Sequence, residues 1–220
     1  MERASYFGNP WVGMFVKTTD TISLVPVDSM DKLNSKVESA LKTNIIRFSV
    51  ADSNLLGVYL AMNKNGIVVP NITTPKEVEM LKSSGLNVVV SSEKINAHGN
   101  NIAVNDKIGI INPHVSTDSI KEMEDALGVE LVPTSIAGYS AVGSTCLLTN
   151  NGFLVHYKAT EEDLDNLKQI LKLPGNKGTV NTGAGFVSYG VIVNSHGYVA
   201  GEATTAFELG RVEEALGLIR

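Results

Sequence analysis

The chain contains 220 residues, 43% of them hydrophobic, and carries a formal net charge of −5 at pH 7. This hydrophobic content is sufficient for a core, but no apolar run approaches the roughly 20 residues that span a bilayer, so we expect no membrane partner. Arginine is scarce and no dense basic stripe is evident, which argues against DNA binding and extensive nucleic-acid contact. The single cysteine excludes an internal disulfide framework and favours a reducing cytoplasm.

One pattern recurs five times along the chain: a strand, a tight turn, a second strand, a capped helix and a third strand. In the clearest copy, residues 56–70, the dipeptide Asn65-Gly66 separates two apolar runs, which is a strong hairpin signal. The matched ends of the second strands are Pro26, Pro70, Pro113, His156 and Gly201, which lie 44, 43, 43 and 45 residues apart. This regular spacing is typical of a repeat architecture and predicts one domain over residues 1–220.

The predicted elements follow the same order in each copy. Hairpins are expected at residues 12–26, 56–70, 101–113, 145–156 and 190–201. Helix starts are expected where a capping residue precedes an acidic or polar residue: Thr74 with Glu77 and Thr205 with Glu208, and, more weakly, Thr160 with Asp163, Ser29 with Lys32 and Thr117 with Asp118. Third strands are expected at residues 45–50, 86–90, 129–132 and 178–181.

The fifth copy ends in its helix, residues 205–216, without a third strand. Residues 3–7 have no place in the first copy, so we expect them to supply the missing strand and close the repeats into a ring. The predicted repeats are residues 12–55, 56–99, 100–142, 143–188, and 189–220 together with 1–11. The predicted fold is therefore α/β, with five pseudo-symmetric units closed by the N-terminal strand.

Residue types that could carry chemistry are isolated from one another. Cys146 lies in an apolar strand, where a buried small hydrophobe is the simpler interpretation. No histidine shares a metal-ligand spacing with the cysteine or another histidine. Residues 174–178 are glycine-rich but lack the spacing of a phosphate-binding loop, and we interpret them as a connecting loop. No catalytic residue, cofactor or metal is expected.

Several separate motifs resemble a known family. They are residues 65–74, Gly99-Asn100 followed by Asn105-Asp106, residues 142–144 leading to Asn151-Gly152, residues 154–156 and residues 178–181. Together, in this order, they are similar to the translation initiation factor 6 family of archaea and eukaryotes, whose members are ribosome anti-association factors. The resemblance extends from Arg3 to about Leu216. The chain lacks the additional C-terminal tail of eukaryotic members, which favours an archaeal member.

The resemblance implies a pentein-type β/α-propeller that acts in initiation and ribosome biogenesis. It also implies binding to the intersubunit face of the large ribosomal subunit, where the protein would sterically prevent association with the small subunit. The implied partners are large-subunit ribosomal proteins fourteen and twenty-four, close to the sarcin-ricin loop of the RNA, bound by a monomer. An acidic factor meeting basic ribosomal proteins would gain mainly in association rate.

The predicted ribosome-binding residues follow from the expected strand starts. If each first strand starts on one face, Gly13, Val58, Asn100, Thr145 and Val191 meet around the axis on that face. Gly13, Asn100 and Ser144 match the family pattern, whereas Val58 and Thr145 replace bulkier residues of eukaryotic members. The alternative interpretation is that these small residues serve only strand and turn geometry.

Two other functions remain open. Pentein rings also include guanidine-modifying enzymes, which use a nucleophilic cysteine with a histidine and carboxylates in the central cavity. This alternative would require Cys146 to meet such partners, although it lies in the fourth copy among leucines. An interaction scaffold with another partner is the second alternative.

Overall fold

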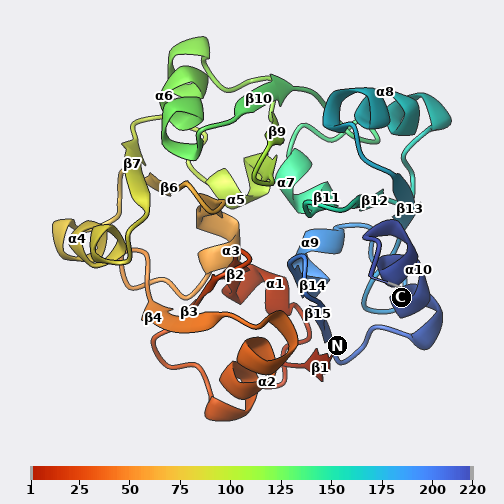
Figure 1. Cartoon of the computed structure of the whole chain (residues 1–220), viewed down its shortest axis with the longest axis horizontal. Helices are drawn as coiled ribbons and strands as arrows, with labels where there is room; N and C mark the ends of the chain where they lie inside the picture. The colour runs from red at the N-terminus through yellow and green to blue at the C-terminus, as the bar shows by residue number, and fades with distance from the viewer. Residues whose placement is uncertain (1, 219–220) are drawn as a thin grey trace.

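The computed structural model describes residues 2–218 and contains five three-stranded sheets. Each unit begins with a four-residue helix and a short strand, turns into an antiparallel second strand, and continues through a long helix to a parallel third strand. Figure 1 shows five units around a common axis, with the four-residue helices near the centre and the long helices outside. The predicted α/β class and its five repeated units are therefore confirmed. Residues 1 and 219–220 of the predicted domain lie outside the described residues.

The elements have the following bounds. The first unit contains α1 (Val12–Phe15), β2 (Lys17–Thr18), β3 (Ile22–Pro26), α2 (Asp31–Leu41) and β4 (Asn44–Phe48). The second contains α3 (Leu56–Tyr59), β5 (Ala61–Met62), β6 (Gly66–Pro70), α4 (Pro75–Ser83) and β7 (Asn87–Ser91). The third contains α5 (His98–Asn101), β8 (Ile102–Val104), β9 (Ile108–Ile111), α6 (Thr117–Leu127) and β10 (Glu130–Pro133). The fourth contains α7 (Val142–Thr145), β11 (Cys146–Leu148), β12 (Phe153–His156), α8 (Glu161–Leu171) and β13 (Gly175–Gly178). The fifth contains α9 (Val187–Gly190), β14 (Val191–Val193), β15 (Tyr198–Gly201) and α10 (Ala206–Ala215).

The N-terminal segment supplies the third strand of the fifth sheet, as predicted. β1 (Glu2–Ala4) pairs in parallel with β15, with Arg3 opposite Ala200. The strand is shorter than the predicted residues 3–7 because Tyr6 and Asn9 exchange backbone hydrogen bonds across a turn. Each of the five sheets is open.

The predicted starts of the first strands are wrong. Residues 12–15, and their counterparts in the other units, form one helical turn, in which the Val16 N–H donates to the Val12 carbonyl. The strand β2 begins only at Lys17. A short apolar run fits a buried helical turn as well as a strand, so the sequence pattern could not separate them. The expected equivalence of Pro113 with Pro70 is also wrong by one residue. In the turns that follow the second strands, the Thr73 N–H donates to the Pro70 carbonyl and the Val115 N–H donates to the Asn112 carbonyl, so Asn112 is the residue equivalent to Pro70.

The glycine-rich segment 174–178 is a strand for most of its length, not the predicted connecting loop. β13 pairs in parallel with β12, and Gly175 lies opposite Phe153. A Cβ on Gly175 would overlap the Phe153 ring, so the position requires glycine. The strand therefore begins at Gly175, three residues before the predicted start at residue 178. Glycine has a low intrinsic preference for strands, but packing against Phe153 overrides that preference here.

Three of the predicted helix caps are confirmed as capping boxes: Thr74 with Glu77, Thr160 with Asp163, and Thr205 with Glu208. Of the three weaker predictions, Thr160 with Asp163 is therefore correct, and the other two are wrong. The N-cap of α2 is Met30, because the Ser29 hydroxyl donates instead to Asn34. The N-cap of α6 is Ser116, one residue before the expected Thr117. The two strongest signals therefore located their helix starts, and one of the three weaker signals did so as well.

The hydrophobic core lies between units rather than inside them. Successive residues of a second strand face different neighbours: Leu24 packs in the cluster between the first and second units, and Val25 in the cluster between the first and fifth. Each of the five core clusters combines residues from two neighbouring units. The second strands are buried on both faces along almost their whole length, which explains their continuous apolar runs in the sequence. A single unit could not bury its apolar surface alone.

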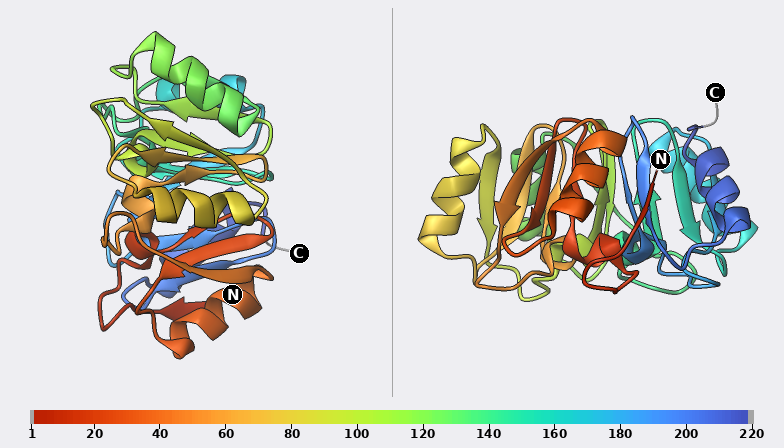
Figure 2. Two further views of the ribbon diagram at one scale, coloured as in Figure 1. Left: turned by 90° about the vertical axis from the view of Figure 1, so that its left-hand side faces the viewer. Right: turned by 90° about the horizontal axis from the view of Figure 1, so that it is seen from below.

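The strands and long helices run between two flat faces of the molecule (Figure 2). The four-residue helices, the ends of the second strands and the starts of the long helices share one face, which we call the collar face. The hairpin turns and the ends of the long helices share the opposite face, which we call the turn face. No helix within residues 2–218 has both the length and the apolar character required to cross a membrane.

Candidate functional site

The four-residue helices meet around the axis on the collar face through backbone contacts. We call the residues at these contacts the glycine collar: Gly13, Gly57, Gly99, Gly143 and Ser188. A Cβ on Gly57 would overlap the Gly13 carbonyl oxygen, far inside the 3.0 Å that real Cβ atoms keep from other atoms. Gly99 and Gly143 repeat this contact with the preceding glycine, and Gly13 meets Ser188 in the same way. The collar brings neighbouring backbones closer than any side chain would permit.

The fifth collar position carries a side chain that is used for a bond. The Ser188 hydroxyl donates to the Ser144 carbonyl oxygen at 3.0 Å, across the contact between α9 and α7. The four-residue helices contact their neighbours all around the axis, including α9 with α1. The four-residue helices therefore form a continuous set of contacts around the axis.

The structure places the six predicted site residues at different depths. Gly13, Ser144, Thr145 and Val191 are buried, and only Val58 and Asn100 are partly exposed. They do not occupy equivalent positions, because the expected strand starts fell within the helical turns. The equivalent residues that follow the collar positions are Met14, Val58, Asn100, Ser144 and Tyr189.

Two predicted residues have specific local roles. The Thr145 hydroxyl donates to the Val142 carbonyl oxygen at 3.2 Å and therefore supports α7. The Asn100 Oδ1 atom is buried and has no hydrogen-bond partner in the described part of the chain. An unpaired buried amide oxygen is costly in isolation, so Asn100 is a candidate for contact with a partner.

An aromatic group beside the collar was not found from the sequence. We call it the aromatic patch: Tyr139, His156, Tyr157, Phe186 and Tyr189. The ring centroids of His156 and Tyr157 are 4.8 Å apart, and those of Tyr139 and Phe186 are 5.3 Å apart. Tyr157 is 45% exposed, and the other rings except His156 are partly exposed. These residues are dispersed over four places in the sequence, so no local motif identifies them.

His156 is the buried member of the aromatic patch. Its Nδ1 accepts a hydrogen bond from the Lys158 backbone N–H at 3.1 Å. Its ring occupies the space beside Gly185, where a Cβ would overlap it. Burial, together with the nearby Lys158 charge, lowers the pKa of His156, so the imidazole is neutral at pH 7. His156 therefore acts as a fixed packing element for the exposed tyrosine.

A tight turn places another exposed aromatic side chain, Phe7, on the collar face. Phe7 and Gly8 have φ values of 48° and 81°, which correspond to a two-residue turn with both positions in the left-handed region. A bulky residue in this conformation is unusual. Phe7 is 61% exposed, and its ring contacts Tyr6 edge-on at 4.9 Å. The turn holds an apolar ring in solvent, as an interaction surface requires.

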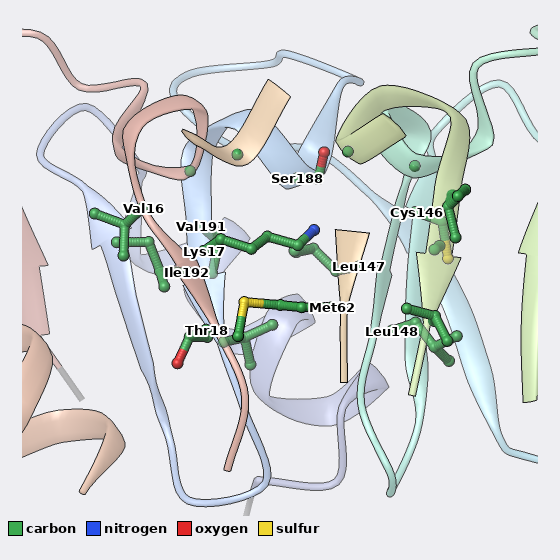
Figure 3. A pocket seen from close by; sticks show the side chains of 18 residues that line it. Val16, Lys17, Thr18, Met62, Cys146, Leu147, Leu148, Ser188, Val191 and Ile192 are labelled. Atoms are coloured by element: carbon green, nitrogen blue, oxygen red, sulfur yellow. The ribbon is translucent and has the colours of Figure 1, made fainter. Parts of the chain in front are cut away.

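A cavity of about 80 Å³ lies on the axis beneath the collar (Figure 3). The Lys17 side chain extends across it, and Cys146 lies in its wall. Cys146 is 3% exposed, and burial raises the pKa of its thiol, so the nucleophilic thiolate is disfavoured. The described residues that line this cavity include no histidine and no carboxylate. Nowhere within residues 2–218 do three or more potential ligands of the histidine, cysteine and carboxylate types gather in a metal-binding arrangement.

Comparison with known proteins agrees with the sequence motifs. A protein-family model described as the eIF-6 family matches residues 1–215. The chain is similar to Translation initiation factor 6 of Pyrobaculum aerophilum, with 36% identity over 211 residues that cover 96% of each chain. It is also similar to proteins of the same name from Picrophilus torridus, with 36% identity covering 98% of this chain and 99% of the relative, and from Pyrococcus abyssi, with 36% identity covering 100% and 99%. The family expected from the motifs is thereby confirmed, and the chain belongs to the eIF-6 family.

Proposed function

We propose that this protein is a translation initiation factor that binds the intersubunit face of the large ribosomal subunit and prevents the small subunit from joining. The observation that carries the proposal is the family match over residues 1–215, with relatives covered along almost their whole length. A broad flat body suits steric occlusion, because it can cover a surface without any chemical step. Ribosome biogenesis, a cytoplasmic location and action as a monomer belong to the same proposal.

We further infer that residues 1–220 form a single pentein-type domain whose units close into a ring. Three observations support closure: β1 pairs with β15, α1 contacts α9, and one core cluster joins the first and fifth units. A closed array needs no polar terminal units, and every unit is supported from both sides. Such support would keep the bound protein rigid when the small subunit approaches.

The collar face is the proposed binding face. It carries the aromatic patch and Phe7, and exposed tyrosine and phenylalanine are enriched in protein interfaces. Among the predicted residues, we assign direct contact to Val58 and Asn100, which are partly exposed. Gly13, Ser144, Thr145 and Val191 would act by shaping the surface from below. The glycine collar is filled by neighbouring backbones, so it would support this face from below rather than contact a partner.

The partners expected from the family resemblance are ribosomal proteins fourteen and twenty-four, with the sarcin-ricin loop nearby. The net charge of −5 fits basic ribosomal proteins better than bare RNA. Long-range attraction of this kind accelerates association and weakens as salt increases. The association rate should therefore fall with ionic strength more than the dissociation rate rises.

The guanidine-modifying alternative has weaker support. It needs a cysteine nucleophile activated by a neighbouring base. Cys146 is buried with a raised pKa, and the described lining of the cavity offers it neither histidine nor carboxylate. Turnover of an arginine analogue that disappears in a Cys146→Ala variant would favour this alternative over ours.

The proposed function is tested by sedimentation with purified ribosomal subunits of a related archaeon. We expect the protein to sediment with large subunits and to reduce the fraction of whole ribosomes. Equal sedimentation with small subunits, or with neither, would contradict the proposal. The binding face is tested by Tyr157→Asp, which places a charge on the collar face, against His196→Asp in an exposed turn of the opposite face. We expect a loss of affinity of at least about tenfold only for Tyr157→Asp, the effect of a lost interface contact of about 1.4 kcal/mol.

A further inference from the structure

Lys17 is a partly buried cation on the axis of the molecule. Its side chain extends across the axial cavity rather than out to solvent (Figure 3). The surface that it keeps accessible therefore faces the cavity. None of the ion pairs or side-chain hydrogen bonds formed within residues 2–218 engages its ammonium group. The charge has no protein counter-ion in the described structure.

Lys17 breaks the repeat pattern. Strand pairing aligns it with one residue in each other unit, and those residues are Ala61, Ala103, Leu147 and Ile192. All four are apolar, as expected at a crowded axis. A charge in place of an aliphatic side chain disfavours folding unless something compensates for the lost hydration.

The carboxylates next to this cavity already accept other hydrogen bonds. A second, smaller cavity adjoins the first toward the turn face and is lined by Asp20 and Asp106. Asp20 accepts hydrogen bonds from the Ser195 N–H at 2.9 Å and the Asn150 side-chain amide at 3.2 Å. Asp106 accepts from the Lys64 N–H at 3.0 Å and the Asn150 amide at 2.8 Å. These bonds hold both carboxylates at the turn face, away from an ion pair with Lys17.

The cavity can accommodate a small ion with its water. One water molecule needs roughly 10–15 Å³ of cavity volume, and this cavity has about 80 Å³. The walls near Lys17 include Met62, Leu147 and Val191. The lining as a whole is more polar than apolar. A singly charged halide still loses less hydration on entry than a multiply charged anion such as phosphate or sulfate.

We propose that the axial cavity binds a small monovalent inorganic anion, such as chloride or bromide, as the counter-ion of Lys17. The ammonium supplies the attraction, and the size of the cavity excludes large organic anions. Burial lowers the pKa of Lys17 to about 8, so the group is still largely protonated at pH 7 and can pair with an anion. A bound anion would raise this pKa, since it stabilises the charged form. The Cys146 thiol in the wall stays neutral and does not compete.

Anion binding should stabilise the folded protein by mass action, since the unfolded chain has no cavity. Thermal unfolding is measured at pH 7 and constant ionic strength while gluconate is replaced by chloride or bromide. We expect the wild-type melting temperature to rise by about 3 °C. Lys17→Met, which keeps the length of the side chain without its charge, should show no rise. Lys158→Met removes an exposed lysine as a control and should respond like the wild type.

Two measurements on the wild-type chain make the proposal independent of any variant. Crystals grown in bromide should show an anomalous peak inside the cavity, beside Lys17 Nζ. The Lys17 pKa, followed by NMR, should be about one unit higher in chloride than in gluconate, whereas a surface lysine should not change. Equal melting shifts in the wild type and Lys17→Met, an empty cavity in bromide, or an unchanged Lys17 pKa would each overturn the proposal.

Discussion

Neighbouring units are joined in different ways at the two ends of the axis. On the collar face, neighbouring units meet backbone to backbone, and side chains are absent at four of the five positions of the glycine collar. On the turn face, side chains make the connection. We call these positions the turn collar: Thr19, Asn63, Asn105, Thr149 and Asn194.

The turn collar is built from amides that cross between units. Asn63 Nδ2 donates to the carbonyl oxygens of Asn105 at 3.1 Å and Leu127 at 2.8 Å. Asn194 Nδ2 makes the same pair of bonds to Thr19 at 3.0 Å and Leu41 at 2.8 Å. Two units carry threonine instead, whose hydroxyl supports only its own turn. A contact made by hydrogen bonds can accept either residue type, whereas the four glycine positions of the glycine collar leave no space for a Cβ.

Adding a methyl group to the glycine collar should have the largest effect. Gly57→Ala or Gly99→Ala places Cβ on a neighbouring carbonyl oxygen, so the helices must separate around the axis. We expect a loss of about 3 kcal/mol or more in the free energy of unfolding, measured by chemical denaturation. Gly210→Ala is the matched control, because it lies in α10 with no atom near its Cβ position. It should gain about 0.5–1 kcal/mol. Wild-type stability for Gly57→Ala would refute the comparison.

A buried histidine makes the collar end sensitive to acid. His98 takes the place of the apolar residues that begin the other four-residue helices, and neither ring nitrogen has a partner within the described residues. Burial lowers its pKa to about 4, with a smaller opposing effect of Glu93. The unfolded chain therefore binds more protons between about pH 6.5 and 4, and stability is lost as the pH falls through that range.

His98→Leu should remove this acid sensitivity. The wild type should lose up to about 3 kcal/mol from this group between pH 7 and pH 4, and the variant should not. Denaturation midpoints measured across this pH range provide the test. His196→Leu, at an exposed turn, should follow the wild-type curve. If both variants follow the wild type, His98 is not the source of the acid effect.

Truncation in the turn collar should cost less than a methyl group added to the glycine collar. Asn194→Ala removes the two bonds between units and the acceptor used by the N–H groups of His196 and Gly197. We expect a loss of about 2 kcal/mol in the free energy of unfolding. Asn194→Thr reproduces the residue found in two other units and should lose about half as much. Asn151→Ala, at an exposed turn position, should remain within about 0.5 kcal/mol of the wild type. A larger loss for Asn194→Thr than for Asn194→Ala would contradict this account.

Local sequence patterns were sufficient to predict the number of units, their order and three of the long-helix starts. These features are local: hairpin turns, capping boxes and apolar runs each depend on neighbouring residues, and their recurrence made each copy support the others. The placement of the N-terminal segment in the fifth sheet also followed, because a missing strand in one copy matched a surplus strand near the first.

The roles of the residues near the axis depend on how the units pack, so these roles could not be predicted from local patterns. Residues 12–15 form a helical turn whose glycine packs directly against a neighbouring backbone, and β13 contains glycine where Phe153 occupies the space of a Cβ. The aromatic patch and the position of Lys17 in the axial cavity depend on contacts between residues that are far apart in the chain. A sequence pattern describes which residues are apolar and how they recur, but not which neighbour they will meet, and at a crowded axis the neighbour determines both conformation and exposure.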